Sequence, residues 1–120
     1  MGQTQRRRSL VDYIPERGDF IRLNFDPQAG HEQMESRPAL VISHTSFNRK
    51  MGFVFVCPVS TTKRKTPFYI RVSQGKKVTG VILADQLRSL DFRVRKAAFI
   101  TKCPEESLQE VLMHIEPIIF

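Results

Sequence analysis

Long apolar runs and secretion signals are absent from this sequence, and cysteines are rare. No apolar run approaches the roughly 18 residues of a membrane-spanning helix. The basic N-terminus MGQTQRRRSL is followed by no apolar stretch of the kind that a secretory signal needs. We therefore expect a cytoplasmic protein that makes no contact with a membrane and builds its core without disulfides.

Cysteine and histidine are too few and too scattered for a metal centre. The 2 cysteines, Cys57 and Cys103, show no CxxC spacing, and only 3 histidines accompany them. Each cysteine lies in an apolar run, which is typical of a buried, reduced thiol. We expect no metal site and two free thiols.

Signature motifs of several enzyme classes are missing as well. The sequence has no P-loop, no Rossmann glycine fingerprint and no Gly-x-Ser-x-Gly elbow. These absences leave reactions that need only acid–base groups and phosphate binders, and no cofactor is expected.

Acidic residues are few beside basic ones. The chain has 19 Lys and Arg against 12 Asp and Glu, a formal net charge of +7. This excess of positive charge predicts an anionic partner. Nucleic acid and an acidic protein fit the charge equally well. Residues 1–13, which include Arg6, Arg7 and Arg8, are expected to form a disordered basic tail. Residues 14–120 have the length of a single domain.

Short apolar runs predict a fold that is mainly β. Alternation over residues 19–25 is typical of a strand with one wet face, which Asp26 and Pro27 end. Residues 48–52 have the length and composition of a hairpin connection. Further strands are predicted at 39–43, 53–59, 68–72, 79–84 and 97–101.

Only one segment has a helical period. Leu108, Val111, Leu112 and Ile115 form an apolar stripe. Pro104 suits the first helical position, and Pro117 is expected to stop the helix. The predicted fold is a small, strongly curved antiparallel β-barrel with a C-terminal α-helix packed on one side.

Three polar segments follow or interrupt the predicted strands, at 30–38 (GHEQMESRP), 60–65 and 85–88. His31, Glu32 and Asp85 are candidate acid–base groups. Arg37 is a planar donor suited to phosphate, and the hydroxyls at 60–62 can donate to phosphate oxygens. If the segments converge at one end of a barrel, this set suits RNA cleavage with the ribose 2′-OH as nucleophile.

Each of these residues also has an ordinary structural explanation. Glu32 and Arg37 can form a surface ion pair, Asp85 can cap a turn, and 63–65 can be a solvated loop. Taken alone, the residues predict only a basic barrel that binds an anion.

Longer stretches of the sequence carry a more specific pattern: RGDFIRLNFDPQAGHEQMESRPALVIS (17–43), FNRKMG (47–52), CPVSTTKRKTPF (57–68), TGVILADQLRSLD (79–91) and the C-terminal helix. Together they resemble the MazF/PemK family, the toxin halves of bacterial type II toxin–antitoxin modules. The resemblance implies an SH3-like barrel that forms a homodimer in the bacterial cytoplasm.

The resemblance also implies an activity. Members are metal-independent endoribonucleases that cut single-stranded RNA at short sequences, leave a 2′,3′-cyclic phosphate and a 5′-OH, and so inhibit translation and growth. A cognate antitoxin with an acidic tail is expected across the substrate face, and DNA is expected to be contacted only through the antitoxin complex.

By position, the family's active arginine falls on Arg37, and its reactive hydroxyl falls on Ser60, where most members have Thr. Thr61 is the alternative hydroxyl. The remaining catalytic positions fall on Glu32, His31 and Asp85. The position two before Asp85, often Arg in the PemK branch, is Leu83 here. We expect RNA contacts from Thr61, Lys63, Arg64, Lys65, Gln33 and Gln86.

Several assignments stay open at this stage. The base that takes the 2′-OH proton is Asp85 or Glu32, and the acid that protonates the leaving oxygen is His31 or Arg37. Phe47, Phe68 and Tyr69 can stack on bases or belong to the core. Two other functions also fit the fold: a gyrase poison of the CcdB type, and a basic nucleic-acid-binding barrel without activity.

Overall fold

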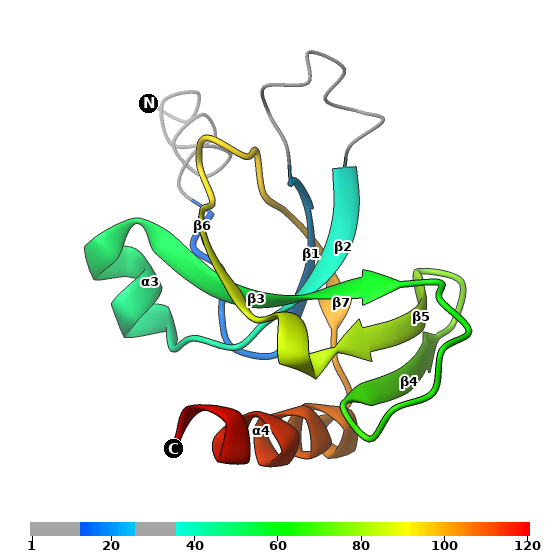
Figure 1. Cartoon of the computed structure of the whole chain (residues 1–120). Helices are drawn as coiled ribbons and strands as arrows, with labels where there is room; N and C mark the ends of the chain where they lie inside the picture. Colours follow the sequence, from blue (N-terminus) through cyan, green and yellow to red (C-terminus); the bar gives the residue numbers. More distant parts are fainter. Residues whose placement is uncertain (1–12, 26–35) are drawn as a thin grey trace, which may run out of the picture.

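The computed structural model describes residues 13–25 and 36–120. Within them, one antiparallel sheet of 7 strands curls into a half-barrel (Figure 1). The strands are β1 (Asp19–Asn24), β2 (Ser36–Val41), β3 (Phe53–Ser60), β4 (Tyr69–Gln74), β5 (Val78–Leu83), β6 (Arg88–Asp91) and β7 (Ala98–Lys102). The helices are α3 (Thr45–Met51), the 3-10 turn η2 (Ala84–Gln86) and α4 (Glu105–Ile119). The predicted mainly β fold with a C-terminal helix is confirmed.

Strand β3 holds the two halves of the sheet together. The sheet order is β4-β5-β3-β2-β1-β7, and β6 also pairs with β3. Val56 in the middle of β3 pairs with Val41 of β2 and with Arg88 of β6. At its end, Ser60 pairs with Val81 of β5 instead. One strand therefore passes from the β6 side of the barrel to the β4–β5 hairpin.

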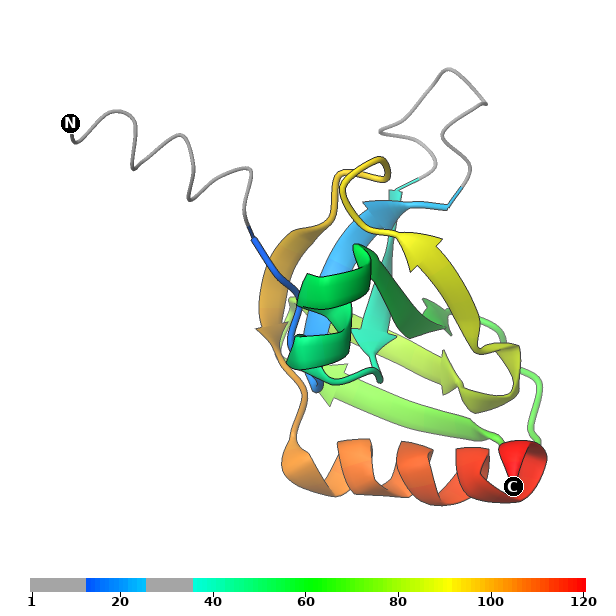
Figure 2. The same ribbon diagram turned by 90° about the vertical axis from the view of Figure 1, so that its left-hand side faces the viewer.

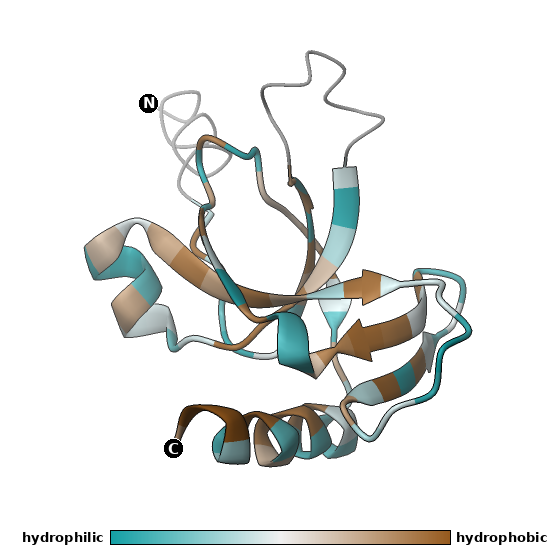
Figure 3. Ribbon diagram, viewed as in Figure 1, coloured by the Kyte–Doolittle hydropathy of each residue, from teal (hydrophilic) through white to brown (hydrophobic). Residues whose placement is uncertain are grey.

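Both faces of the β1–β2–β3 layer are buried, which explains why these strands are so apolar. One face packs against α4 and the β4–β5 hairpin and includes Phe20, Leu40 and Cys57. The other face lies inside the curl, under β6, and includes Leu23 and Val56. In Figure 3 the apolar colour covers much of β3 and β5 and the last turn of α4.

The cysteines lie on the α4 side of this layer, and both are buried and free, as expected. The pKa of Cys57 is raised to about 12 and that of Cys103 to about 11, and burial is the largest cause of both shifts. Both thiols are therefore protonated at neutral pH. No helix in the described ranges is long and apolar enough to cross a membrane.

The predicted hairpin connection at 48–52 is wrong, because these residues belong to the end of α3. The side chain of Asn48 is fully buried, donates to the Pro15 carbonyl (2.8 Å) and accepts from the Ser43 hydroxyl (2.5 Å). Gly52, at φ 73°, ends the helix and donates its N–H to the Asn48 carbonyl. A residue typical of turns thus serves a buried hydrogen-bond network.

The C-terminal helix follows its predicted apolar stripe, with Leu108, Val111 and Ile115 buried. Its predicted ends shift. Pro104 is the N-cap and precedes the first helical residue, and the helix runs through Pro117 to Ile119. Pro117 is exposed and lies in the last turn, so its missing N–H removes only one intrahelical hydrogen bond.

Candidate active site

The candidate site continues the inner face of the barrel. Along a strand every second side chain points to the same side, and directly paired residues share a face. Leu23 of β1 pairs with Arg37 of β2, two residues beyond the pair formed by Ile21 and Ala39. Ala39 pairs in turn with Pro58 of β3. Arg37 therefore lies on the face that buries Leu23 and Ala39, one step nearer the barrel's open end.

The same change from apolar to polar occurs on the other strands of this face. On β3, Val54 and Val56 are buried, and Pro58 and Ser60 follow at the same period. On β6, Leu90 pairs with Val54 and Arg88 pairs with Val56. The core thus fills one end of the barrel, and a polar pocket opens at the other.

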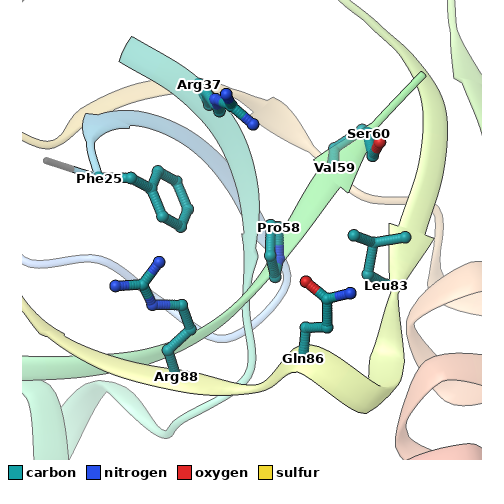
Figure 4. A pocket seen from close by; sticks show the side chains of 8 residues that line it. All are labelled: Phe25, Arg37, Pro58, Val59, Ser60, Leu83, Gln86 and Arg88. Carbon is teal, nitrogen blue, oxygen red and sulfur yellow. The ribbon is translucent and has the colours of Figure 1, made fainter. Parts of the chain in front are cut away.

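This pocket encloses about 450 Å³ (Figure 4). Its walls come from four strands, η2 and the residue after β1. The lining residues are Phe25, Arg37, Pro58, Val59, Ser60, Leu83, Gln86 and Arg88. Four of the lining residues are apolar, and two guanidinium groups, one hydroxyl and one amide supply the polar atoms of the side chains. All of the polar groups can donate a hydrogen bond, which suits an anionic ligand.

Arg37 is exposed near the start of β2. In the described part of the chain, the only ion pairs join Lys102 to Glu16 and Asp19, so no described carboxylate neutralises Arg37. The guanidinium keeps its donors for a ligand. This agrees with the phosphate-binding role that the sequence predicts for it.

Ser60 lies in the pocket at the end of β3, and Thr61 does not line it. The Ser60 Oγ accepts the backbone N–H of Thr62 at 3.1 Å. That hydrogen bond fixes the oxygen and leaves its own proton free to be donated to a ligand. Of the two candidate hydroxyl residues, Ser60 is the one that lines the pocket together with Arg37.

Five lining residues were not candidates from the sequence, and two of them, Arg88 and Phe25, bring a charge and an aromatic ring to the pocket. Arg88 was assigned to a polar connection, because β6 has only 4 residues and too little apolar character to be recognised as a strand. Its spacing of two from the apolar Leu90 was the available signal. Phe25 was interpreted only as the end of an apolar strand, yet its ring lies in the pocket, 5.1 Å from the Arg88 Cζ.

The other predicted residues divide into three groups. Gln86 lines the pocket, whereas Asp85, its neighbour on η2, is exposed and is not among the lining residues. Thr61, Lys63, Arg64 and Lys65 are exposed in the connection that follows β3, beyond Ser60. His31, Glu32 and Gln33 lie outside the described residues.

The three candidate stacking aromatics do not line the pocket either. Phe47 packs on Phe55 at 5.7 Å, and Phe68 packs against the α4-side core. Tyr69 lies under the Arg64 guanidinium at 5.9 Å. Within the described ranges, no group of three or more His, Cys, Asp or Glu side chains could hold a metal ion.

Comparisons with known proteins agree with this fold. Residues 16–119 match the model of the PemK-like, MazF-like toxins of type II toxin–antitoxin systems. The endoribonuclease toxin MazF of Escherichia coli is 37% identical over 107 residues, covering 89% of this chain and 96% of that protein. The crystal structure of MazF from Deinococcus radiodurans superposes with a TM-score of 0.79 at 41% identity, over 90% of this chain and 98% of that one.

A crystal structure of a MazE–MazF complex from the same organism gives a TM-score of 0.79 at 34% identity, covering 90% of this chain and 97% of the matched chain. The match therefore spans the fold, the strands that build the pocket and the C-terminal helix. The resemblance seen in the sequence motifs is confirmed. This chain belongs to the family of PemK-like, MazF-like toxins of type II toxin–antitoxin systems.

Proposed function

We propose that this chain is an endoribonuclease toxin that cuts single-stranded RNA at short sequences without a metal ion and thereby inhibits translation. The observation that carries the proposal is the pocket itself: Arg37, Ser60 and Arg88 line it, and no carboxylate is among its described lining residues. Such a pocket favours a phosphodiester, whose negative charge increases as a pentacoordinate phosphorane forms.

The proposed reaction needs one bond made and one broken. The ribose 2′-oxygen attacks the adjacent phosphorus, and the bond from phosphorus to the 5′-oxygen of the next nucleotide breaks. The 2′-OH proton passes to a base, and the leaving 5′-oxygen receives a proton from an acid. The products are a 2′,3′-cyclic phosphate and a 5′-OH, with no water consumed, and the 2′-OH requirement selects RNA over DNA.

Arg37 and Ser60 are assigned to the non-bridging phosphate oxygens. The guanidinium presents paired donors and remains charged, so it stabilises the extra charge of the transition state. The Ser60 Oγ is already positioned by the Thr62 N–H, and its own proton stays free to be donated to the substrate. An arginine side chain ordinarily keeps its proton at neutral pH, so we assign Arg37 an electrostatic role and the acid role to His31.

The base is assigned to Glu32 or Asp85. Asp85 lies beside the pocket on η2 without lining it. Glu32 belongs to the connection between β1 and β2, and Arg37 is the second residue of β2. We favour Glu32, because Asp85 is not a lining residue of the pocket.

The proposed partners are an antitoxin and a second copy of the chain. A D. radiodurans relative is solved as a MazE–MazF complex, and a net charge of +7 suits an antitoxin with an acidic tail. DNA would be reached only through that complex, in the bacterial cytoplasm.

Exposed apolar side chains support the homodimer. Figure 2 views the side of the molecule that carries α3 and the C-terminal end of α4. Large exposed apolar residues on these elements and at the start of β3 are Phe47, Met51, Phe53, Ile118, Ile119 and Phe120. A second copy covering them would remove an apolar surface that water solvates poorly.

The direct test of function is digestion of a long RNA by the purified chain in excess EDTA, followed by sequencing of the new ends. Cleavage at a recurrent short sequence, with cyclic phosphate and 5′-OH ends, is the expected result. Intact RNA together with inhibition of DNA gyrase would favour the CcdB-type alternative.

A further inference from the structure

Phe25 is held at the edge of the pocket by packing on the core and by a hydrogen bond to its backbone carbonyl. It packs against the inner core of the barrel and is half-buried. The Arg95 guanidinium donates to the Phe25 carbonyl (2.5 Å) and to the Asn24 carbonyl (3.2 Å). The Asn24 N–H donates in return to the Arg95 carbonyl at 2.9 Å. The backbone that carries the ring is therefore held in place before any ligand binds, and the ring itself packs on the core.

Arg88 approaches the Phe25 ring from β6. Its Cζ lies 5.1 Å from the ring centroid, a cation–π contact. No ion pair or hydrogen bond from the Arg88 side chain occurs within the described part of the chain. The guanidinium is thus oriented by an aromatic ring rather than by a carboxylate, and its hydrogen-bond donors remain available to a ligand.

The pocket is divided by Pro58 into two chemically different sides. In Figure 4, Phe25 and Arg88 lie on one side of Pro58 with Arg37 above them, and Ser60, Leu83 and Gln86 lie on the other side. The proline ring and the phenyl ring give an apolar surface, which a phosphate does not need. A volume of about 450 Å³ is at the lower end of the ~300–1,000 Å³ range of ligand pockets, so it suits one nucleotide unit.

We propose that Phe25 and Arg88 form a nucleobase subsite next to the phosphate subsite of Arg37 and Ser60. The base of a nucleotide flanking the scissile phosphate stacks on the wall made by the Phe25 ring and the Arg88 guanidinium. Aromatic rings and guanidinium planes are the usual platforms for unstacked RNA bases. Arg88 also neutralises the phosphate attached to that nucleotide. This subsite rests on the proposed function, because it assigns a place to the RNA that Arg37 and Ser60 would cut.

The stacking part is tested with a binding measurement that needs no catalysis. The probe is a fluorescein-labelled 2′-O-methyl RNA of the cleaved sequence, which lacks the nucleophile. A second set of probes carries an abasic residue at each position flanking the cleavage site in turn. Phe25→Leu keeps apolar bulk and removes the ring, and Phe99→Leu, on exposed β7, is the matched control.

With the intact probe, Phe25→Leu is expected to weaken binding about tenfold, and Phe99→Leu to leave it unchanged. With the abasic residue at the stacking position, the Phe25→Leu loss is expected to disappear, because the partner of the ring is already gone. Equal losses with intact and abasic probes at every position would overturn the subsite. Thermal melting of each variant confirms that the fold is intact.

The phosphate part is tested by salt. Arg88→Gln removes one cation from the pocket, and Arg93→Gln is the matched control, since Arg93 lies 4.9 Å over Phe92 outside the pocket. The slope of log Kd against log salt is expected to fall by about 0.7 for Arg88→Gln and to stay unchanged for Arg93→Gln. An unchanged slope for Arg88→Gln would overturn its phosphate contact.

The two proposals can fail separately. If the wild-type chain leaves long RNA intact, the proposed function fails, and the subsite fails with it. If the wild-type chain cleaves RNA and the Phe25→Leu loss is the same with and without the base, only the subsite is overturned.

Discussion

Arg37 of β2 lies directly opposite Leu23 of β1, so a charged side chain continues the row that buries a leucine. Leu23 is 1% exposed, whereas Arg37 is open to solvent. Because side chains alternate along a strand, the inner face of the barrel changes from buried core to open pocket within two residues. A register shift of one residue would turn Arg37 to the opposite face, so the pairing that closes the core also positions the site.

The hydroxyl of the pocket is expected to be Ser60. Ser60→Ala should lower the cleavage rate about 10²-fold, because it removes a donor aimed at the developing charge. Thr61→Ala should stay close to the wild-type rate, and Ser60→Thr should retain activity, since the donor oxygen is kept. Single-turnover cleavage of one RNA by all three variants measures this. A larger loss for Thr61→Ala than for Ser60→Ala would reverse the assignment.

The two candidate carboxylates, Glu32 and Asp85, are expected to differ clearly in their effect on the cleavage rate. Glu32→Gln should reduce cleavage by about 10²–10⁴-fold, as loss of a general base does. Asp85→Asn should cost much less, because Asp85 is exposed and is not a described lining residue of the pocket. Single-turnover rates across pH 5–9 decide between them. If the acidic limb of the pH profile disappears in Asp85→Asn and persists in Glu32→Gln, the base is Asp85.

Gly80 is expected to support Ser60 through close backbone packing. A Cβ at Gly80 would lie 2.4 Å from the Ser60 carbonyl oxygen, and the backbone there has φ 150°. Gly80→Ala should therefore lower both the melting temperature and the cleavage rate, because the end of β3 must move.

Gly75→Ala is the control for Gly80→Ala. Gly75 also has a positive φ, 59°, but a Cβ would meet nothing within 4 Å. This variant should lose a little stability and no activity. Equal activity of Gly80→Ala and the wild type would show that Ser60 does not depend on this contact.

A buried carboxylate network predicts loss of stability at alkaline pH. Asp19 is 2% exposed and accepts hydrogen bonds from Tyr13 (2.7 Å) and Lys102 (2.6 Å). Burial, and then the hydrogen bond to Asp19, raise the pKa of Tyr13 well above its usual value. The hydrogen bond to Asp19 is the largest cause of the raised pKa of Lys102.

A group whose pKa is raised by folding stabilises the fold fully below its unfolded pKa, and this contribution is lost as pH rises above it. Both groups have unfolded values of about 10, so the free energy of unfolding should be level at neutral pH and fall above about pH 10. Urea unfolding of the wild type and of the double variant Tyr13→Phe, Lys102→Gln measures this. The double variant should be less stable at pH 7 and show a flatter alkaline decline; an equally steep decline would exclude the network as its cause.

The sequence predicts those parts of the molecule in which local pattern and tertiary structure agree. The apolar stripe of α4 and the strands around Phe20 and Val56 were recognised because burial gives them a clear period. Asn48 and Pro117 led to wrong predictions of a turn and of a helix end. Asn48 belongs to a buried hydrogen-bond network, and Pro117 destabilises a helix little when it lies in the last turn. Both outcomes depend on long-range packing, which a short stretch of sequence does not reveal.

The same limit applies to the site. Arg37 and Ser60 were identified from a family motif and a polar segment, and both line the pocket. Arg88 and Phe25 were missed because their importance comes from β6 pairing with β3, which brings residues 25, 37, 60 and 88 to one face. Spacing along the chain does not reveal which strands are neighbours.

The most direct test of the account is single-turnover cleavage of a labelled RNA by the wild type and by Arg37→Ala, in excess EDTA. The wild type should leave a 2′,3′-cyclic phosphate and a 5′-OH. Arg37→Ala should lose at least about 10²-fold in rate and melt at the wild-type temperature, because Arg37 is exposed and makes no described ion pair. Cleavage by Arg37→Ala within about threefold of the wild-type rate would contradict the proposed role of the pocket.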